Sequence, residues 1–291
     1  MSGNRRSIWR SKYAWAGFLL PSLVGVSVLV LLPFLDVVKR SFLTAVTGEW
    51  SGLHNYGQVL ENRAFRLAVA NTLRFTVVCL PLLIGIGLFL AVQMSRVRWL
   101  PLLKALYLFP LAMPAAVAVL VWRMVFDRQG MLNGLLERLS LIPADGLVDY
   151  MGTGAAFRVL VFSYIWKNLG YTIVLWLAGI FSLSPDMLAA AKVDGANDRQ
   201  CFWRVVFPNL KGSLYTITVL SFINSFKVFR EAYLVAGAYP HESMYLLQHL
   251  FNNWFLNLEL DKMAAAAVLV GLLLLGVILL LQRLWEVEGD A

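Results

Sequence analysis

The sequence predicts an all-α integral membrane protein with six transmembrane helices and a two-helix cytoplasmic loop between the fourth and fifth of them. Hydrophobic residues make up 59% of the 291 residues and charged residues only 14%, an apolar share above that of ordinary soluble domains. Five runs free of Asp, Glu, Lys and Arg are each about as long as a membrane is thick, and they cover 13–35, 75–95, 105–122, 168–185 and 263–282. The runs lack the alternation of a barrel strand, so helices are expected.

Six spans follow from these runs and their flanking residues. A sixth, shorter run at 212–226 stops at Lys227, and Tyr233 to Ala236 continue its apolar character. The expected spans are roughly 13–38, 67–92, 100–125, 157–181, 209–237 and 263–285. Since no region outside them is long enough to fold alone, residues 1–291 are expected to form a single membrane domain. Prolines inside spans are expected to kink them, namely Pro21, Pro81, Pro110 and Pro114.

The distribution of positive charge predicts that both termini are cytoplasmic. With that orientation the inner segments, 1–12, 93–104, 182–211 and 283–291, carry 12 Lys and Arg in 63 residues, and the outer segments, 39–66, 123–158 and 238–262, carry 9 in 89. The higher density therefore lies inside, as the positive-inside rule requires. The first apolar stretch is too long for the core of a signal peptide, so it is expected to remain as the first helix.

Several functional classes find no support in the sequence. The net charge of +8 is scattered over the loops, without the basic run of a nucleic-acid-binding protein. No Gly-x-x-x-x-Gly-Lys-Ser/Thr segment is present to hold ATP phosphates. The histidines and the two cysteines lack metal-ligand spacing, and no catalytic motif is present. We therefore expect no enzyme activity, no catalytic residue, no metal and no cofactor in this chain, and no nucleic-acid partner.

The loop at 182–208 contains clear local signals for two short helices. Ser184 can cap the first helix, Pro185 suits its first turn, and Asp186 complements its dipole. Gly195 can end this helix, and Asn197 with Gln200 three residues later is typical of a capping box. Pro208 is expected to limit the second helix, and the turn is expected to expose Phe202 and Trp203.

Within this loop the chain resembles the permease family of bacterial ABC importers. That family carries Glu-Ala-Ala, three residues, Gly, nine residues and then Ile-x-Leu-Pro. The matching positions here are Ala190-Ala191, Asp194-Gly195-Ala196 and Val205-Val206-Phe207-Pro208. Ala189 stands where the family has Glu, and Phe207 stands where it has Leu. Further segments resemble the sugar-type, maltose-permease-like branch: Asn55-Tyr56, Asn71-Thr72, Pro110, Gly130 to Asn133, and Trp176 to Gly179.

The resemblance implies that the loop couples the helices to a separate ATPase. The residues that it places in coupling are Asp186, Ala190, Ala191, Asp194, Gly195, Ala196, Phe202, Trp203 and Pro208. ATP and Mg²⁺ would then bind two copies of a partner ATPase subunit. A second permease, for which the resemblance favours a different chain, an extracytoplasmic solute-binding protein and membrane lipid would complete the assembly, in a bacterial cytoplasmic membrane.

Polar and charged side chains inside the spans are candidates for the solute pathway, because charges in lipid are costly. The residues expected to line it are Tyr164, Lys167, Asn168 and Tyr171 in the fourth span, and Asn224, Lys227 and Glu231 in the fifth. Such groups suit a sugar or a related polar solute. The alternative is that charged residues such as Arg74, Lys167 and Arg230 reach the interface or bridge helices.

Two other functions and one further helix complete the expectations. An ion-coupled secondary transporter is the main alternative to an ATP-driven importer that works by alternating access. A membrane partner of an ATPase that moves no solute is the other. Residues 243–258 predict one amphipathic helix, which either packs on the outer end of the bundle or docks an external partner.

Overall fold

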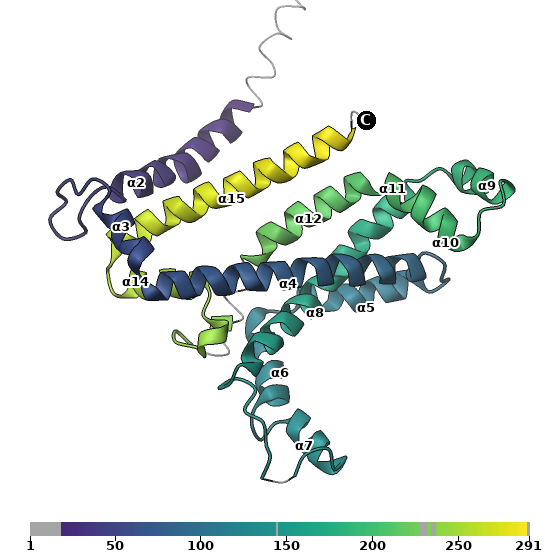
Figure 1. The fold of residues 1–291 in the computed structure, drawn as a ribbon, viewed down its shortest axis with the longest axis horizontal. Helices are drawn as coiled ribbons and strands as arrows, with labels where there is room; N and C mark the ends of the chain where they lie inside the picture. The colour runs from purple at the N-terminus through teal and green to yellow at the C-terminus, as the bar shows by residue number, and fades with distance from the viewer. Residues whose placement is uncertain (1–18, 144, 227, 229–231, 234–236, 290–291) are drawn as a thin grey trace, which may run out of the picture. The chain divides into compact units, whose positions relative to one another are not determined.

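The computed structural model describes residues 19–143, 145–226, 228, 232–233 and 237–289. By its internal packing the chain forms two compact units. The first unit comprises Met1–Asn62 and Trp254–Gly276, and the second comprises Arg63–Asn253 and Val277–Ala291. Apart from turns, loops and an isolated bridge between Leu43 and Trp50, the described chain is built from helices (Figure 1).

Four helices among the described residues are long and apolar enough to cross a membrane: Leu19–Arg40, Arg63–Met94, Ala155–Phe181 and Leu260–Trp285. They overlap the first, second, fourth and sixth predicted spans, and the described ends differ from the predicted ones by at most four residues. The predicted start of the first span, at residue 13, lies outside the described residues. The first contains a π-helical turn, η1 (Ser27–Leu31), followed by α2 (Leu32–Arg40). The others are α4 (Arg63–Met94), α8 (Ala155–Phe181) and α15 (Leu260–Gly289). The prediction of an all-α membrane fold is confirmed.

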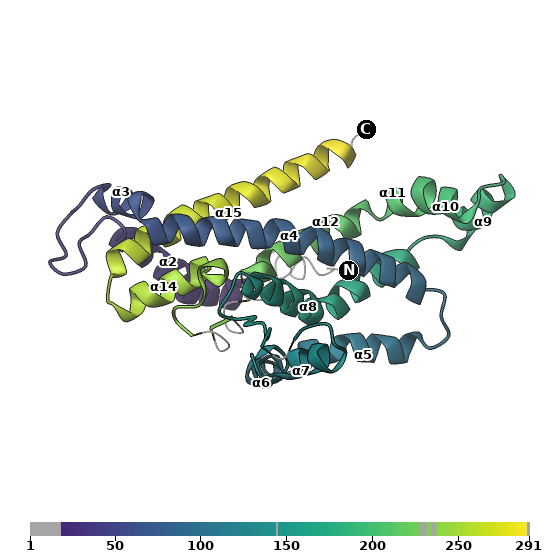
Figure 2. The ribbon, with the colours of Figure 1, turned by 60° about the horizontal axis from the view of Figure 1, so that its bottom comes forward.

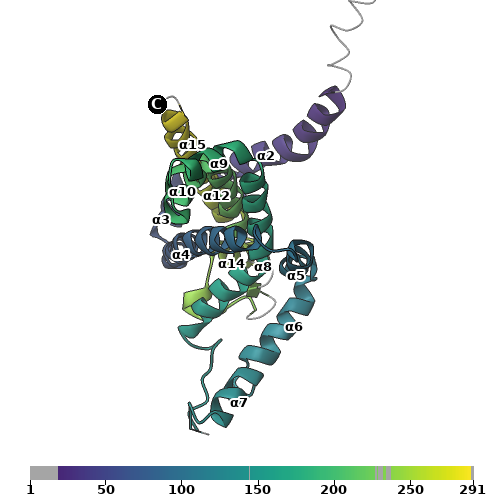
Figure 3. The same cartoon turned by 90° about the vertical axis from the view of Figure 1, so that its right-hand side faces the viewer.

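The third predicted span is divided into two helices. Helix α5 (Leu100–Ala112) is followed by α6 (Ala115–Phe126) and α7 (Met131–Arg138), and the chain bends by 94° between Ala112 and Ala115. Figure 3 shows α6 turning away from the axis of α5. Pro114 is the N-cap of α6, so a residue that donates no hydrogen bond lies at the break. In contrast, α4 continues as one helix through Pro81.

The fifth predicted span is described over α12 (Lys211–Ser225), which has 15 residues. Its expected continuation to residue 237 falls largely on residues outside the described part. The structure therefore describes four helices that could span, or five when the bent pair counts as one, and the predicted number of six stays a prediction.

The first unit contains a small ordered turn after α2. Leu43 and Trp50 form an antiparallel bridge, and the ring of Phe42 stacks on that of Trp50 at 5.3 Å. Helix α3 (His54–Glu61) supplies Asn55, whose amide donates to the carbonyls of Ser41 and Leu43. The Tyr56 hydroxyl lies 2.6 Å from that of Ser41. The Asn55-Tyr56 pair therefore has a structural role, which is to fasten this turn.

The second unit is organised around α8, which packs against α4, α5 and α12 (Figure 2). A side chain at Gly170 would place its Cβ 2.0 Å from the backbone oxygen of Tyr107 in α5. Glycine is therefore required there for the two backbones to approach so closely. One apolar cluster lies between α4 and the second half of α8, around Trp176, whose indole N–H donates to the carbonyl of Ile84.

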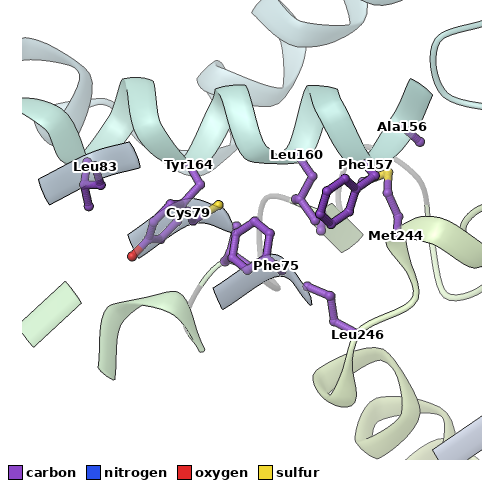
Figure 4. Packing of buried hydrophobic residues seen from close by; sticks show 11 residues of the cluster. Phe75, Cys79, Leu83, Ala156, Phe157, Leu160, Tyr164, Met244 and Leu246 are labelled. Carbon is purple, nitrogen blue, oxygen red and sulfur yellow. The ribbon is translucent and has the colours of Figure 1, made fainter. Parts of the chain in front are cut away.

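A second apolar cluster lies between α4 and the first half of α8. Phe75, Cys79 and Leu83 come from α4, and Ala156, Phe157, Leu160 and Tyr164 come from α8 (Figure 4). A segment after α12 contributes Met244, which ends the short 3-10 helix η3 (Glu242–Met244), and Leu246. The predicted amphipathic helix is α14 (Leu247–Leu256), shorter than expected.

Candidate functional site

The loop after α8 forms its first helix, α9 (Pro185–Val193), as predicted. The Ser184 hydroxyl accepts a hydrogen bond from the backbone N–H of Asp186 at 3.3 Å. Pro185 occupies the first helical position, and Asp186 lies in the first turn, where a carboxylate is favoured by the helix dipole. Asp186, Ala189, Ala190 and Val193 are all exposed, so one face of α9 is available to a partner.

Gly195 ends α9 in the manner that the sequence predicted. Its φ is +81°, in the left-handed region that glycine adopts without strain. The N–H of Gly195 donates to the carbonyl of Lys192 at 3.1 Å, and that of Ala196 donates to the carbonyl of Ala191 at 3.0 Å. These two bonds form a Schellman motif, so the turn between the two helices is fixed by its own backbone.

The second helix begins with the predicted capping box. Asn197 Oδ1 accepts from the N–H of Gln200 at 2.8 Å, and Gln200 Oε1 accepts from the N–H of Asn197 at 2.9 Å. Helix α10 (Asp198–Cys201) then passes into a π-helical turn, η2 (Phe202–Val206), and a short α11 (Phe207–Asn209). The helical run thus continues one residue past Pro208, where the sequence predicted its limit. The π turn ends at Val206, two residues before this proline.

Three aromatic side chains pack together on this second helix. The Trp203 ring lies 5.2 Å from that of Phe202 and 5.3 Å from that of Phe207. Trp203 is 56% exposed and Val193, at the end of α9, is 87% exposed. Phe202 is partly buried and faces a cavity, so the expectation that it is exposed together with Trp203 was wrong. The arrangement leaves one large aromatic and one aliphatic side chain uncovered.

A cavity of about 590 Å³ lies between the loop and the ends of α4 and α8. Its lining is largely apolar, and it is joined by the charged residues Arg96, Lys192 and Asp198 and the buried thiol of Cys201. Arg96 Nη1 and Asp198 Oδ2 are 3.6 Å apart, and both side chains are more than 60% exposed. An exposed pair of this kind contributes little to stability. The loop is therefore fastened to the helices chiefly at its two ends.

A smaller cavity of about 180 Å³ lies midway along α8. It holds about six water molecules at a share of roughly 30 Å³ each. Its lining residues come from α5, α6, α8, the end of α12 and the segment after it, and they are Leu111, Ala118, Trp122, Ser163, Tyr164, Trp166, Lys167, Asn168, Asn224 and Val228. Four of the predicted pathway residues, Tyr164, Lys167, Asn168 and Asn224, therefore meet at one cavity.

The structure limits what two of these residues can offer a solute. The Tyr164 hydroxyl donates to the carbonyl of Ser221 at 2.9 Å, and the Asn168 amide donates to the carbonyl of Tyr164 at 2.9 Å. Tyr171 does not line the cavity. Lys227 and Glu231, with Arg230, lie outside the described residues. The guanidinium of Arg74 lies over the Phe157 ring at 4.4 Å, which fits the alternative that it is a structural residue.

Two aromatic residues of this cavity were missed by the sequence reasoning. Trp122 of α6 and Trp166 of α8 lie 5.0 Å apart at 76°. Both line the cavity beside the polar groups of α8. The sequence gives no sign of this position for Trp122, because no local pattern shows that α6 lies against α8. A charged or amide group beside an aromatic face is an arrangement that suits a polar solute with an apolar ring face.

Long apolar helices, a cavity midway along one of them that combines polar groups with aromatic rings, and a two-helix loop at its end are typical of a multi-pass membrane transport protein. The family described as "Binding-protein-dependent transport system inner membrane component" matches residues 83–286. The chain belongs to this family, and it is a transport permease rather than an enzyme.

Relatives of known type agree with this assignment. The xylose/arabinose import permease protein XacH of Haloferax volcanii is 31% identical over 78% of this chain and 72% of its own length. The arabinooligosaccharides transport system permease protein AraP of Bacillus subtilis is 30% identical over 80% of this chain and 75% of its own. The trehalose/maltose transport system permease protein MalF of Thermococcus litoralis is 29% identical over 88% of both chains.

Two solved structures share the fold. A chain in the crystal structure of a bacterial ABC transporter that imports the acidic polysaccharide alginate has a TM-score of 0.83 and 19% identity, covering 96% of this chain and 98% of that one. A chain of the alginate transporter in complex with its alginate pentasaccharide-bound periplasmic protein has a TM-score of 0.81 and 17% identity, covering 96% of both. These likenesses concern the fold alone.

Proposed function

We propose that this chain forms half of the pathway of an ATP-driven importer for a sugar or a related polar solute. The observation that carries the proposal is the position of the two functional features on one helix. The cavity beside Lys167 lies midway along α8, and the two-helix loop follows directly after the end of this helix at Phe181. A movement of the loop is therefore passed to the walls of the cavity through a single rigid helix.

Energy is proposed to come from two copies of a separate ATPase subunit, which bind ATP and Mg²⁺. Residues 182–208 are the proposed coupling element, and they dock through the exposed face of α9 and through Trp203. Asp186, Ala190 and Ala191 lie in the first helix, Asp194, Gly195 and Ala196 form the turn, and Phe202, Trp203 and Pro208 belong to the second helix. The self-capped turn supports this role, since a docking element must keep its shape when a partner moves.

The proposed assembly contains two further proteins. A second permease, a different chain, supplies the other half of the pathway, and an extracytoplasmic solute-binding protein delivers the solute. The relatives named as permeases for xylose and arabinose, arabinooligosaccharides, and trehalose and maltose support a sugar as solute. The Trp122 and Trp166 rings beside Lys167 and Asn224 are consistent with this class of solute.

We further propose that residues 1–291 form one transmembrane domain of six spans in a bacterial cytoplasmic membrane, with both termini in the cytoplasm. The charge distribution along the loops supports this orientation. It places the two-helix loop in the cytoplasm, where ATP is available.

Co-purification tests the coupling role. The tagged chain is extracted in mild detergent at native expression level and its bound proteins are identified. Val193→Asp and Trp203→Ala change the two most exposed apolar side chains of the loop, and Trp99→Ala changes a tryptophan that is 69% exposed and lies outside it. We expect a P-loop ATPase with the wild type and with Trp99→Ala, and at least a tenfold loss with the two loop variants.

Transport in proteoliposomes tests the solute. The purified complex is supplied with ATP inside and with the binding protein and a labelled pentose or disaccharide outside, and uptake is compared with and without ATP. ATP-dependent accumulation supports an importer. Uptake that follows an ion gradient without ATP would support a secondary transporter, and solute-independent ATPase binding without uptake would support a non-transporting partner.

A further inference from the structure

Three asparagines of this chain share an unusual environment. Asn55, Asn71 and Asn133 are 1%, 8% and 0% exposed. Each donates its side-chain amide to two backbone carbonyls of an irregular segment: Asn55 to Ser41 and Leu43, Asn71 to Glu242 and Tyr245, and Asn133 to Arg128 and Val148. The asparagine NH₂ group has two donors, so one buried side chain fastens a segment at two points. Of the three, Asn71 lies on α4, the helix that packs along α8.

Asn71 and its neighbour Thr72 hold the segment Glu242–Leu247 against α4. The Asn71 amide lies 2.6 Å from the Glu242 oxygen and 3.0 Å from the Tyr245 oxygen. The Thr72 hydroxyl accepts from the N–H of Leu247 at 3.1 Å and donates to the carbonyl of Ala68 at 2.7 Å. Three backbone groups of this segment thus find their partners on α4, over 170 residues away in the sequence.

The fastened segment fills the space between α4 and α8 with apolar side chains. Met244 and Leu246 are each 1% exposed and belong to the cluster with Phe75, Phe157 and Leu160. Figure 4 shows Met244 beside Phe157, at the end of α8 marked by Ala156. The segment is therefore a plug inserted at the beginning of α8, at the end opposite to the two-helix loop.

The plug lies next to the cavity midway along α8. A void of about 10 Å³ is lined by Met244, Ala232, Met151, Val159 and Leu160, together with Trp122 and Ser163, and the last two also line that cavity. A void of this size barely holds one water molecule. Toward the beginning of α8, the cavity is therefore followed by closely packed apolar side chains, among them Met244, Phe157 and Leu160. An apolar barrier of this type hinders the passage of water and polar solutes.

We propose that the segment Glu242–Leu247 is the outer gate of the solute pathway, and that Asn71 and Thr72 are positioning residues that make it move with α4. This inference rests on the proposed function and its orientation, in which the beginning of α8 faces outward. Because the gate is bound to α4 by side chains and to α8 by apolar contacts, separation of the two helices withdraws Met244 from the apolar barrier.

ATP hydrolysis by the complete complex in lipid nanodiscs, without solute or binding protein, tests the inference. Asn71→Ala removes both bonds to the gate, whereas Asn133→Ala removes two equivalent bonds in a different loop, together with a third that Asn133 Oδ1 accepts from the N–H of Val148. In the proposed mechanism, the gate opens in the same conformational state in which the two ATPase subunits close on ATP. A gate that holds the resting state closed therefore keeps basal hydrolysis low. We expect Asn71→Ala to raise basal hydrolysis at least fivefold, the effect of losing one to two hydrogen bonds, and Asn133→Ala to leave it unchanged.

An equal basal rate in the two variants overturns the inference. If the wild-type complex itself hydrolyses no ATP in response to solute and binding protein, the proposed function fails instead, so the two failures are distinct. When Asn71→Ala does not assemble, a second measurement decides.

That measurement is the labelling of Met244→Cys by a membrane-impermeant maleimide added outside, in a chain with Cys79→Ala and Cys201→Ala. We expect protection in the resting complex and at least tenfold faster labelling when a non-hydrolysable ATP analogue traps the complex. Val46→Cys, at a position that is 96% exposed, is expected to react equally in both states. Equal labelling of Met244→Cys in the two states excludes a gate at this segment.

Discussion

A different segment lies at each end of α8, and the two are stabilised differently: one by hydrogen bonds within itself, the other by hydrogen bonds to a distant helix. After the last residue of α8, the turn of the two-helix loop is closed by bonds between residues at most five apart, such as Ala196 to Ala191 and Asn197 to Gln200. At the first residues of α8, the segment Glu242–Leu247 depends on Asn71, which is 171 residues from Glu242. A locally closed turn keeps its shape wherever it moves, whereas a segment held by a distant helix changes whenever that helix shifts.

Lowering the pH is expected to have the largest effect on stability, and only at the segment Glu242–Leu247, which is held by the distant helix α4. Burial lowers the pKa of His249, in α14, to about 4, and its Nδ1 accepts from the N–H of Leu246. The unfolded chain binds this proton near pH 6.5, so stability is present above pH 6.5 and is lost as the pH falls toward 4. The full loss is about 3 kcal/mol.

Hydrogen exchange at pH 7.5 and 5 measures this effect. Residues 242–250 are expected to lose protection at the lower pH, and residues 185–209 are expected to keep theirs. His249→Asn, which retains an acceptor, removes the dependence in this pH window. If wild type and variant lose protection alike, other groups are responsible.

Thr72→Val is expected to have the next largest effect, again at the distantly held end. Valine has the shape of threonine but no hydroxyl, so the buried N–H of Leu247 loses its acceptor at a cost of about 2 kcal/mol. The midpoint of thermal unfolding in detergent and the exchange rates of residues 242–250 measure the loss. Thr72→Ser keeps the acceptor and is expected to lie close to the wild type. Equal behaviour of the two variants would contradict the assigned hydrogen bond.

Gly195→Val tests the locally held end. A side chain at φ +81° costs about 1–2 kcal/mol in the left-handed region, although no neighbouring atom lies within 4 Å of the added Cβ. We expect ATP hydrolysis to become uncoupled from uptake while the unfolding midpoint of the bundle changes little. Gly195→Asn is the matched control, because asparagine tolerates this conformation. Normal uptake by Gly195→Val would count against the coupling role.

Asn197→Ala is expected to have the smallest effect. It removes one half of the capping box and costs about 1 kcal/mol of local helix stability. Limited proteolysis of residues 194–204 in detergent measures it, with Asn197→Ser as a variant that keeps a cap. A twofold to fivefold faster cleavage of the alanine variant alone is expected, and equal cleavage of both variants would contradict a role for the side chain.

The same difference explains which features the sequence predicted. Ser184, Gly195 and the Asn197–Gln200 pair act on neighbours in the chain, so their roles could be predicted residue by residue. Runs of apolar residues predicted the approximate place of the four long helices. Asn71-Thr72 was noticed only as a family resemblance, because a hydrogen bond to residue 242 leaves no local pattern. The place of Trp122 in the cavity midway along α8 was missed for the same reason, because it depends on the 94° bend before α6.

The predicted pathway residues fall between these cases. Tyr164, Lys167, Asn168 and Asn224 share a cavity, as the cost of polar groups in a span suggested. The sequence did not predict that the Tyr164 hydroxyl is bound to the carbonyl of Ser221. Helical spacing predicts which residues share a face, and only the neighbouring helix decides which polar atoms remain available.

Because a cavity of about 590 Å³ lies behind the two-helix loop, the loop is supported by the helices mainly near its two ends. Leu183, Val206 and Leu210 pack into the apolar cluster around Trp176, while Leu188, Cys201 and Phe202, between them in the sequence, line the cavity. A force on Trp203 is therefore transmitted to α8 and α12 through the residues that join the loop to these helices. The rigidity of these two connections determines how far a displacement of the loop rotates the helices.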